Sequence, residues 1–329
     1  MYLKCFVCLL FSSLCCFPQS SVDVKNFNYR RADSIALHFP KRKYKTVSAV
    51  AEVLTENLTT EHEKFRAIFR WITDNIEYNK SAQNIADADK VVRKNKAVCQ
   101  GFSNLLKEMC DVVNIPCEMI TGYTKTEVSD INRKLKKTDH AWNCVKLYGK
   151  WYLVDVTWAT SKYNVVTHKF QKEFDEYYFI APPEKFILDH FPAPPTKQQA
   201  EQIEQEGIYK GKYKYYFQFL DKPVKKKEFG GWPVYYTDFF HLQMVSITPG
   251  KGAFSWKLEK PVHIEIQSNT PLKDAAVLVN FDKFVTPVEL KDLGGSKYAF
   301  DYVFPLKGKT DLTVYANGVC IAEYLVQVK

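Results

Sequence analysis

Apolar residues recur at helical spacing in two stretches of the N-terminal half of the chain. In the first stretch, the residues that share one helical face are Phe65, Ile68, Phe69, Ile72 and Ile76. Just before it, Thr60-Glu61-His62-Glu63 is a candidate capping box, because the Thr oxygen and the Glu carboxylate can each satisfy a free amide at a helix start. The pattern predicts a helix that begins near residue 61 and packs on the core.

The second helical stretch follows residue 98. Its apolar face consists of Phe102, Leu105, Leu106, Met109, Val112 and Val113. Asn114-Ile115-Pro116 should end this helix, because proline disfavours helical geometry in the residue before it.

Strand patterns come next. A short strand is predicted over residues 118–123, followed by a polar, basic loop through Asp139. Two further runs, residues 140–147 and 151–158, are separated by Tyr148-Gly149-Lys150, which indicates a β-hairpin. Helices followed by antiparallel strands predict an α+β domain that ends near residue 189.

The C-terminal part of the chain is rich in strand-like runs with Gly, Pro and Asn between them, which is typical of a β-sandwich of immunoglobulin-like size. These runs are residues 240–247, 262–266, 276–279, 298–304, 312–315 and 322–328. A proline-rich stretch at 181–195 and a polar tract after it indicate a connection between domains. The expected division is a signal peptide at 1–20, an N-terminal segment at 21–60, a catalytic domain at 61–190, a linker at 191–239 and a β-sandwich at 240–329.

The first twenty residues have the layout of an export signal. A single cation, Lys4, precedes an uncharged apolar run over residues 5–17 and then Pro18-Gln19-Ser20. This run is too short for a comfortable membrane span, and no later stretch is apolar enough for one. The sequence therefore predicts export to the periplasm, the cell surface or the medium. A lipid anchor at Cys15 or Cys16 is disfavoured, because Ser13-Leu14-Cys15 lacks the small residues that usually precede a lipidated cysteine.

Four of the nine cysteines lie in the predicted signal, so an odd number remains and at least one thiol must stay unpaired in an oxidising compartment. Cys110 and Cys117 could pair, although buried free thiols are the simpler interpretation. No Cys or His spacing indicates zinc. Basic runs are scattered through the chain, whose net charge is +9, so the pattern favours a cationic surface and no nucleic-acid partner.

Cys99 is the candidate nucleophile, because it falls where a loop becomes a helix. Free amides of the first turn and the helix dipole favour the thiolate there. The backbone N–H groups of Cys99 and Gln100 are candidate donors to an oxyanion. Gly101 fits a crowded helix start, since it has no side chain, and it is also a candidate cleft residue.

The predicted hairpin places His140, the candidate base, near Asp155. If Tyr148-Gly149 is a two-residue turn, Leu147 faces Lys150, and Asp155 then lies opposite Trp142. His140 has the parity of Trp142, so it lies one diagonal step from Asp155, at roughly 7 to 8 Å between backbones. This spacing suits a His base with an Asp that orients it.

Other residues near these positions have two possible roles. Trp142 and Trp158 are candidates for the cleft wall or the core, and the core is favoured for Trp158. Asn143 should point away from Cys99 and make a structural hydrogen bond. The basic loop over residues 133–137 either borders the cleft, where it would favour anionic substrates, or is simply solvated, which is the favoured interpretation.

Three motifs together resemble the transglutaminase-like superfamily: Cys99-Gln100-Gly101-Phe102, Asp139-His140-Ala141-Trp142-Asn143 and Asp155-Val156-Thr157-Trp158. The chain is most similar to the kyphoscoliosis-peptidase-like branch over about residues 61–190, where Tyr177-Tyr178-Phe179 and His190-Phe191-Pro192 also look like that branch. The resemblance implies a papain-like core with Cys99 as nucleophile, His140 as base and Asp155 as orienter. Residues 196–207 depart from the branch, because Lys and Gln stand where an aromatic residue is expected.

The sequence therefore predicts an exported cysteine hydrolase that acts on a peptide or protein substrate, with no metal and no organic cofactor. The alternatives are a transglutaminase, in which an amine accepts the acyl group, and a non-catalytic cell-surface binding protein. In that second alternative the β-sandwich is the part that binds a protein or cell-surface partner.

Overall fold

The computed structural model describes residues 23–40, 43–164, 169–193, 224–279 and 285–329. The predicted signal peptide and the tract at 196–207 lie outside these ranges. Among the described helices, none combines the length and the apolar character that crossing a membrane requires.

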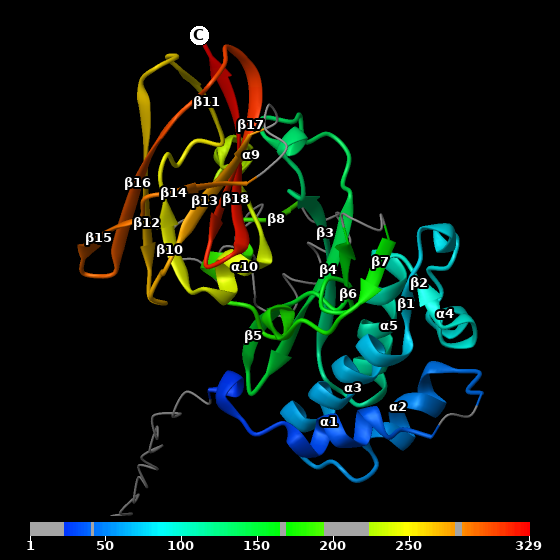
Figure 1. The fold of residues 1–329 in the computed structure, drawn as a ribbon. Coiled ribbons are helices and arrows are strands. Elements are labelled where there is room, and N and C mark those ends of the chain that lie inside the picture. The colour runs from blue at the N-terminus through cyan, green and yellow to red at the C-terminus, as the bar shows by residue number, and fades with distance from the viewer. Residues whose placement is uncertain (1–22, 41–42, 165–168, 194–223, 280–284) are drawn as a thin grey trace, which may run out of the picture.

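The N-terminal half begins with helices, coloured blue to cyan in Figure 1. They are α1 (Arg30–Leu37), α2 (Val47–Thr55), α3 (Glu61–Asn75), α4 (Ala88–Lys94) and α5 (Cys99–Val112), with short 3-10 turns at Val24–Asn26 and Lys80–Ala82. The Thr60 side chain caps α3 by accepting from the Glu63 amide, as the sequence predicts. All five predicted apolar positions of α3 are completely buried, so this helix is anchored by its core face.

A sheet of four antiparallel strands lies against these helices, in the order β5-β4-β3-β8. The strands are β3 (Cys117–Thr124), β4 (His140–Leu147), β5 (Lys150–Val154) and β8 (His190–Pro192). Helix α5 packs on β3 and β4. The nucleophile's helix and the histidine's strand are therefore direct neighbours.

The predicted hairpin is confirmed by the register of β4 and β5. Leu147 pairs with Lys150, and Tyr148 and Gly149 both have positive φ, as a tight two-residue turn requires. The prediction that the second strand continues to residue 158 is wrong, because β5 ends at Val154. The Asp155 carboxylate accepts the backbone N–H groups of Thr157 and Trp158, and this turns the chain out of the strand.

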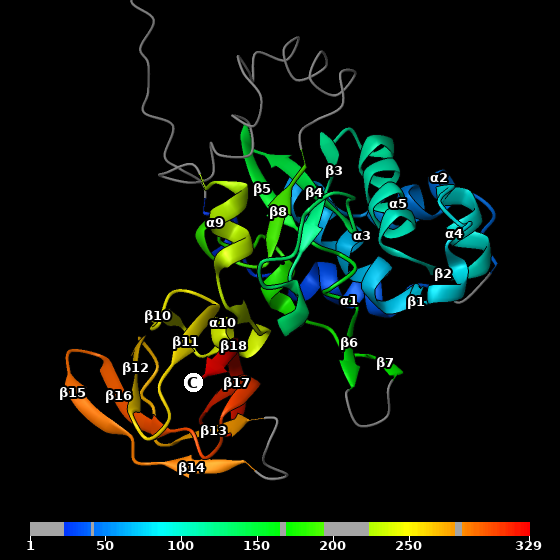
Figure 2. The same ribbon diagram turned by 90° about the horizontal axis from the view of Figure 1, so that it is seen from above.

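Short elements complete this half. β1 (Glu77–Tyr78) and β2 (Lys96–Ala97) form a small parallel ladder just before Cys99, and β6 (Ser161–Asn164) pairs with β7 (Lys169–Lys172) in a hairpin that extends from the body in Figure 2. Single turns occur at η3 (Val128–Asp130), η4 (Glu176–Tyr178) and α6 (Pro183–Phe186).

The C-terminal half consists of two sheets packed face to face, which confirms the predicted β-sandwich. One sheet contains β10 (Met244–Ile247), β12 (Pro261–Ser268), β16 (Lys297–Val303) and β15 (Lys291–Gly294). The other contains β11 (Ala253–Trp256), β18 (Val319–Val328), β17 (Gly308–Ala316), β13 (Ala275–Val279) and β14 (Thr286–Val288), with β9 (Val234–Tyr235) paired to β18. Ile264 and Phe300 from the first sheet share a buried core with Val314 and Tyr324 from the second.

The two halves pack together through aromatic residues and through helix α9 (Lys226–Gly231), which packs on the N-terminal half. The Tyr177 ring stacks on Phe240 of α10 (Thr237–His241) at 4.5 Å between centroids. Helix α9 lies against the β5-β4-β3-β8 sheet, and its Phe229 is buried in the same core as α3 and α5. Val24 and Val50 belong to that core too, so it extends on both sides of the segment 61–190.

Candidate active site

Cys99 is the first residue of α5, partly exposed to solvent. The residue before it, Val98, is extended and has no capping side chain, so the first amides of the helix have no acceptor within the helix. Burial opposes the thiolate, but a hydrogen bond and the positive charge of His140, with the Ala141 amide, outweigh it and lower the pKa of Cys99 below its usual value. The helix start thus holds a reactive thiol.

His140 is the first residue of β4, and it lies between Cys99 and Asp155. Its Nε2 is 2.6 Å from Asp155 Oδ2, and its ring also hydrogen-bonds the Cys99 thiol. Burial disfavours the imidazolium, but the Asp155 carboxylate and Cys99 more than compensate and raise the pKa of His140 to about 10. The two opposite shifts both favour a thiolate–imidazolium pair of Cys99 and His140.

Asp155 is completely buried at the end of β5. Its Oδ1 accepts the Thr157 and Trp158 amides at 2.8 and 3.0 Å, and its Oδ2 faces the two histidines, His140 and His190. Burial alone would raise the pKa of this carboxyl, but the two histidines hold it well below its usual range. These four donors keep the Asp155 carboxylate ionised and fix its orientation.

The structure thus brings together the three residues that the sequence singles out. The amides of Cys99 and Gln100 are at the first positions of the same helix, where an oxyanion on a substrate bound to Cys99 would meet them. Gly101 is buried, and a Cβ there would lie 2.5 Å from the Ile85 carbonyl oxygen. Gly101 is therefore required by packing, and it does not line a cleft.

The two tryptophans differ in burial, and the core position favoured for Trp158 agrees with its packing against the hydrophobic core. Trp142 is completely buried in the core, so its proposed place on the cleft wall is wrong. Trp158 is only partly buried, and its ring lies 5.3 Å from that of His140. Phe186 of α6 contacts the Trp142 ring edge-on and covers the face of the hairpin on which Trp142 lies.

Asn143 makes the structural hydrogen bond expected of it, but in a different direction. Its Nδ2 donates to the Ser103 carbonyl at 3.0 Å, one turn after Cys99 on α5. The side chain therefore faces the nucleophile's helix and does not point away from it. This contact ties β4 to α5 and helps to fix His140 relative to Cys99.

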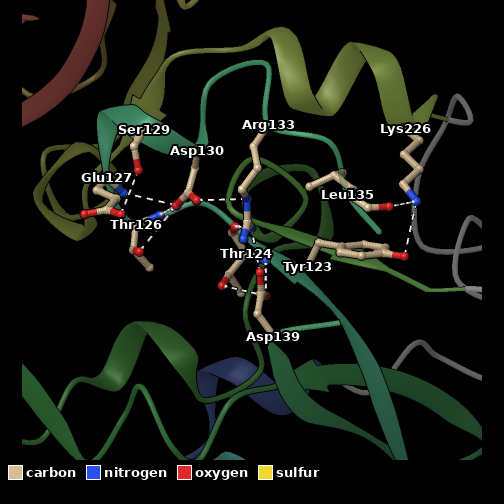
Figure 3. Close-up of polar contacts among 10 residues, drawn as sticks. All are labelled: Tyr123, Thr124, Thr126, Glu127, Ser129, Asp130, Arg133, Leu135, Asp139 and Lys226. Carbon is tan, nitrogen blue, oxygen red and sulfur yellow. Dashed lines mark hydrogen bonds and ion pairs between the residues drawn. The ribbon is translucent and has the colours of Figure 1, made fainter. Parts of the chain in front are cut away.

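The loop between β3 and β4 is ordered by charged contacts, as Figure 3 shows. The Arg133 guanidinium forms an ion pair with Asp130 Oδ1 at 3.0 Å and donates to Asp139 Oδ2 at 2.5 Å, and Asp139 in turn accepts from the Thr124 amide. Because Arg133 is paired with these carboxylates, it is not available to attract an anionic substrate. Lys134, Lys136 and Lys137 are exposed, in agreement with a solvated loop.

Two further residues lie at the site without having been assigned a role from the sequence. His190 Nε2 donates to Asp155 Oδ2, and only its place in the His190-Phe191-Pro192 motif could have indicated it. Tyr78 of β1 is half-buried, and burial together with the nearby Cys99 and Asp155 raises its pKa. Its ring packs against Phe170 of β7 at 4.6 Å between centroids.

His140, Asp155 and His190 also have the composition of a metal-binding group within the described residues. Their nitrogens lie 2.6 and 3.0 Å from one carboxylate oxygen, which are the lengths of direct charge-assisted hydrogen bonds. An ion placed among them would have to displace the bonds that align the histidine with Cys99. The geometry is that of a hydrogen-bonded chain.

Residues 48–156, which include Cys99, His140 and Asp155, match the model of the transglutaminase-like superfamily. The kyphoscoliosis peptidase of Homo sapiens is 35% identical over 145 residues, which is 42% of this chain and 22% of that protein. Hillarin of Drosophila melanogaster is 23% identical over 90% of this chain and 37% of its own length. A solved structure described as a TGase has 17% identity and a TM-score of 0.27 over 48% of this chain and 38% of its own.

Residues 48–156 therefore match a transglutaminase-like domain, and the chain is similar to the kyphoscoliosis peptidases over less than half of its length, in agreement with its motifs. It spans less than a quarter of the human relative's length.

Proposed function

We propose that this chain is an exported cysteine hydrolase that cleaves peptide or amide bonds through an acyl-enzyme. The observation that carries the proposal is the buried alignment of Cys99, His140 and Asp155, with the thiolate and the imidazolium paired. The triad is complete, which argues against a purely structural or binding role for this core.

In the first step the Cys99 thiolate adds to the substrate carbonyl carbon. The oxyanion accepts hydrogen bonds from the amides of Cys99 and Gln100, and the C–N bond then breaks as the His140 imidazolium gives its proton to the leaving nitrogen. Asp155 holds the ring in the orientation and charge state that this transfer needs.

In the second step neutral His140 removes a proton from water, whose oxygen adds to the thioester carbon. The C–S bond breaks, the carboxylic acid leaves and the thiolate is restored. A transglutaminase differs only here, because an amine takes the place of water. The partly exposed Cys99 is consistent with access of water to the thioester.

The test is to incubate the mature chain with a peptide mixture, with and without a primary amine, and to analyse the products by mass spectrometry. Peptide cleavage that is lost in Cys99→Ala supports the hydrolase, and amine incorporation would establish the transferase instead. Cys320→Ala is the matched control, because this partly exposed thiol lies on the β-sandwich and burial raises its pKa. A chain with neither activity and an unreactive Cys99 would be the non-catalytic binding protein. Export is tested separately, by sequencing the N-terminus of the protein recovered outside the cytoplasm.

A further inference from the structure

His190 is a completely buried histidine that takes no part in the mechanism above, yet it lies between two buried carboxylates. Its Nε2 is 3.0 Å from Asp155 Oδ2, and its Nδ1 is 2.5 Å from Asp189 Oδ1. A neutral imidazole has one N–H and can donate to one acceptor only. With a carboxylate oxygen at each nitrogen, the ring satisfies both contacts when it carries both protons and a positive charge.

Water is excluded around this ring by aromatic side chains. Phe186 stacks on it at 4.0 Å, and the Trp158 and Trp142 rings lie 4.3 and 5.1 Å from it. Charges enclosed in this way are poorly screened, so their mutual effects are stronger than at a surface.

The groups that face His190 come from every neighbouring element. The charged or titratable ones are Asp155 after β5, Asp189 before β8, His140 on β4 at 5.5 Å between rings, and Tyr178 of η4 at 6.2 Å. Lys125 after β3 also acts on Asp189, but burial lowers the pKa of Lys125 to about 7, so it carries only part of a positive charge at neutral pH. From Cys99 to Asp189 the charges therefore alternate in sign along one buried chain of side chains.

We propose that His190 is a positioning residue of the triad: as a cation held by Asp189, it keeps the Asp155 carboxylate ionised and directed at His140. The consequence for catalysis rests on the proposed hydrolase function, but the effect on Cys99 itself does not. If His190 is removed, the two buried carboxylates of Asp155 and Asp189 lose the cation between them. Asp155 Oδ2 also loses one of its two donors. Asp155 would then take up a proton more readily, and the thiolate–imidazolium pair would lose its support.

The test measures the rate of Cys99 alkylation by iodoacetamide from pH 4 to 10, which needs no substrate. His190→Gln keeps a donor but removes the charge, and we expect the acid limb of the profile to move up by about one pH unit, with about a fivefold slower reaction at the wild-type midpoint. Asp189→Asn should move the limb in the same direction, because the ring loses its counter-charge. His263→Gln is the matched control, since this exposed histidine pairs with Asp301 on the sandwich.

Folded His190→Gln and Asp189→Asn proteins whose acid limbs coincide with that of the wild type would overturn the proposal. If both variants fail to fold, the side-chain ¹⁵N shifts of His190 in the wild-type chain decide: two protonated ring nitrogens at pH 7 support it and a neutral ring refutes it. Because alkylation reports only the thiolate, a shifted limb in a chain that cleaves no peptide would refute the proposed function and leave the role of His190 standing.

Discussion

The guanidinium of Arg133 donates to the carboxylate of Asp139, the residue directly before His140, at 2.5 Å between Nη2 and Oδ2. Since Arg133 also forms an ion pair with Asp130, the start of β4 is tied to the preceding loop by one side chain (Figure 3). Two contacts therefore position His140. Asp155 hydrogen-bonds its ring, and the loop holds Asp139, the residue directly before it.

Removing that side chain should loosen His140 without unfolding the chain. For Arg133→Ala we expect a loss of stability of about 1 kcal/mol, because the ion pairs are half-exposed, and a several-fold slower alkylation of Cys99. Urea unfolding and alkylation kinetics measure the two effects. Lys134→Ala, an exposed neighbour, should change neither. An Arg133→Ala protein with unchanged alkylation would show that the loop does not position His140.

Asp155→Asn should disable the triad while conserving its shape. The amide cannot compensate the imidazolium, so the pKa of His140 falls, that of Cys99 rises, and hydrolysis drops by up to about four orders of magnitude. Peptide cleavage at saturating substrate measures the drop. Asp301→Asn removes the carboxylate of the exposed His263 pair and is expected to leave the rate unchanged; a fall of equal size there would point to a general loss of structure.

The pH profile of hydrolysis follows from the two shifted groups. The lowered pKa of Cys99 means that the thiolate persists to a lower pH than that of an ordinary thiol, so the acid limb of the activity should lie below the ordinary thiol range. His140, with a pKa of about 10, keeps the proton that the leaving amine needs until the solution becomes alkaline, so activity falls above that value. A rate constant measured from pH 4 to 11 checks both limbs. A basic limb near pH 6.5 would mean that Asp155 does not support the imidazolium.

Gly101→Ala should destabilise the chain and displace Cys99. The new Cβ would lie 2.5 Å from the Ile85 carbonyl oxygen and 2.8 Å from the Ala97 Cβ, so α5 has to shift at its first turn. Overpacking of this kind costs about 1 to 3 kcal/mol, which urea unfolding measures. In Gly230→Ala of α9 the added Cβ has no atom within 4 Å, and we expect no loss. Equal stability of Gly101→Ala and the wild type would remove the packing reason for glycine.

The parts of the site that depend on local rules could be predicted from the sequence. Leu147 pairs with Lys150 because a two-residue turn and the strand period fix the register, and that register brings Asp155 near His140. The capping Thr60 and the helix start at Cys99 follow from the same kind of local signal.

The parts that depend on distant segments could not be predicted. Trp142 is buried because Phe186 covers it from a later element, and nothing in the hairpin sequence determines that cover. The two partners of Arg133 are apparent only once the loop is folded. His190 reaches Asp155 because β8 adds to the sheet beside β3, a long-range pairing that residue spacing does not reveal.

Helix α9 sets a lower limit on any fragment that can carry the triad. Lys226 donates to the Tyr123 hydroxyl and to the Leu135 carbonyl, and Lys125 donates to the carbonyls of Trp232 and Pro233. A fragment that ends at residue 190 would keep Cys99, His140 and Asp155 but lose Phe229 from its core and lose the backbone acceptors of Lys125. Expression boundaries for this domain should therefore be placed beyond Pro233, so that the fragment includes α9 and the two carbonyls that bind Lys125.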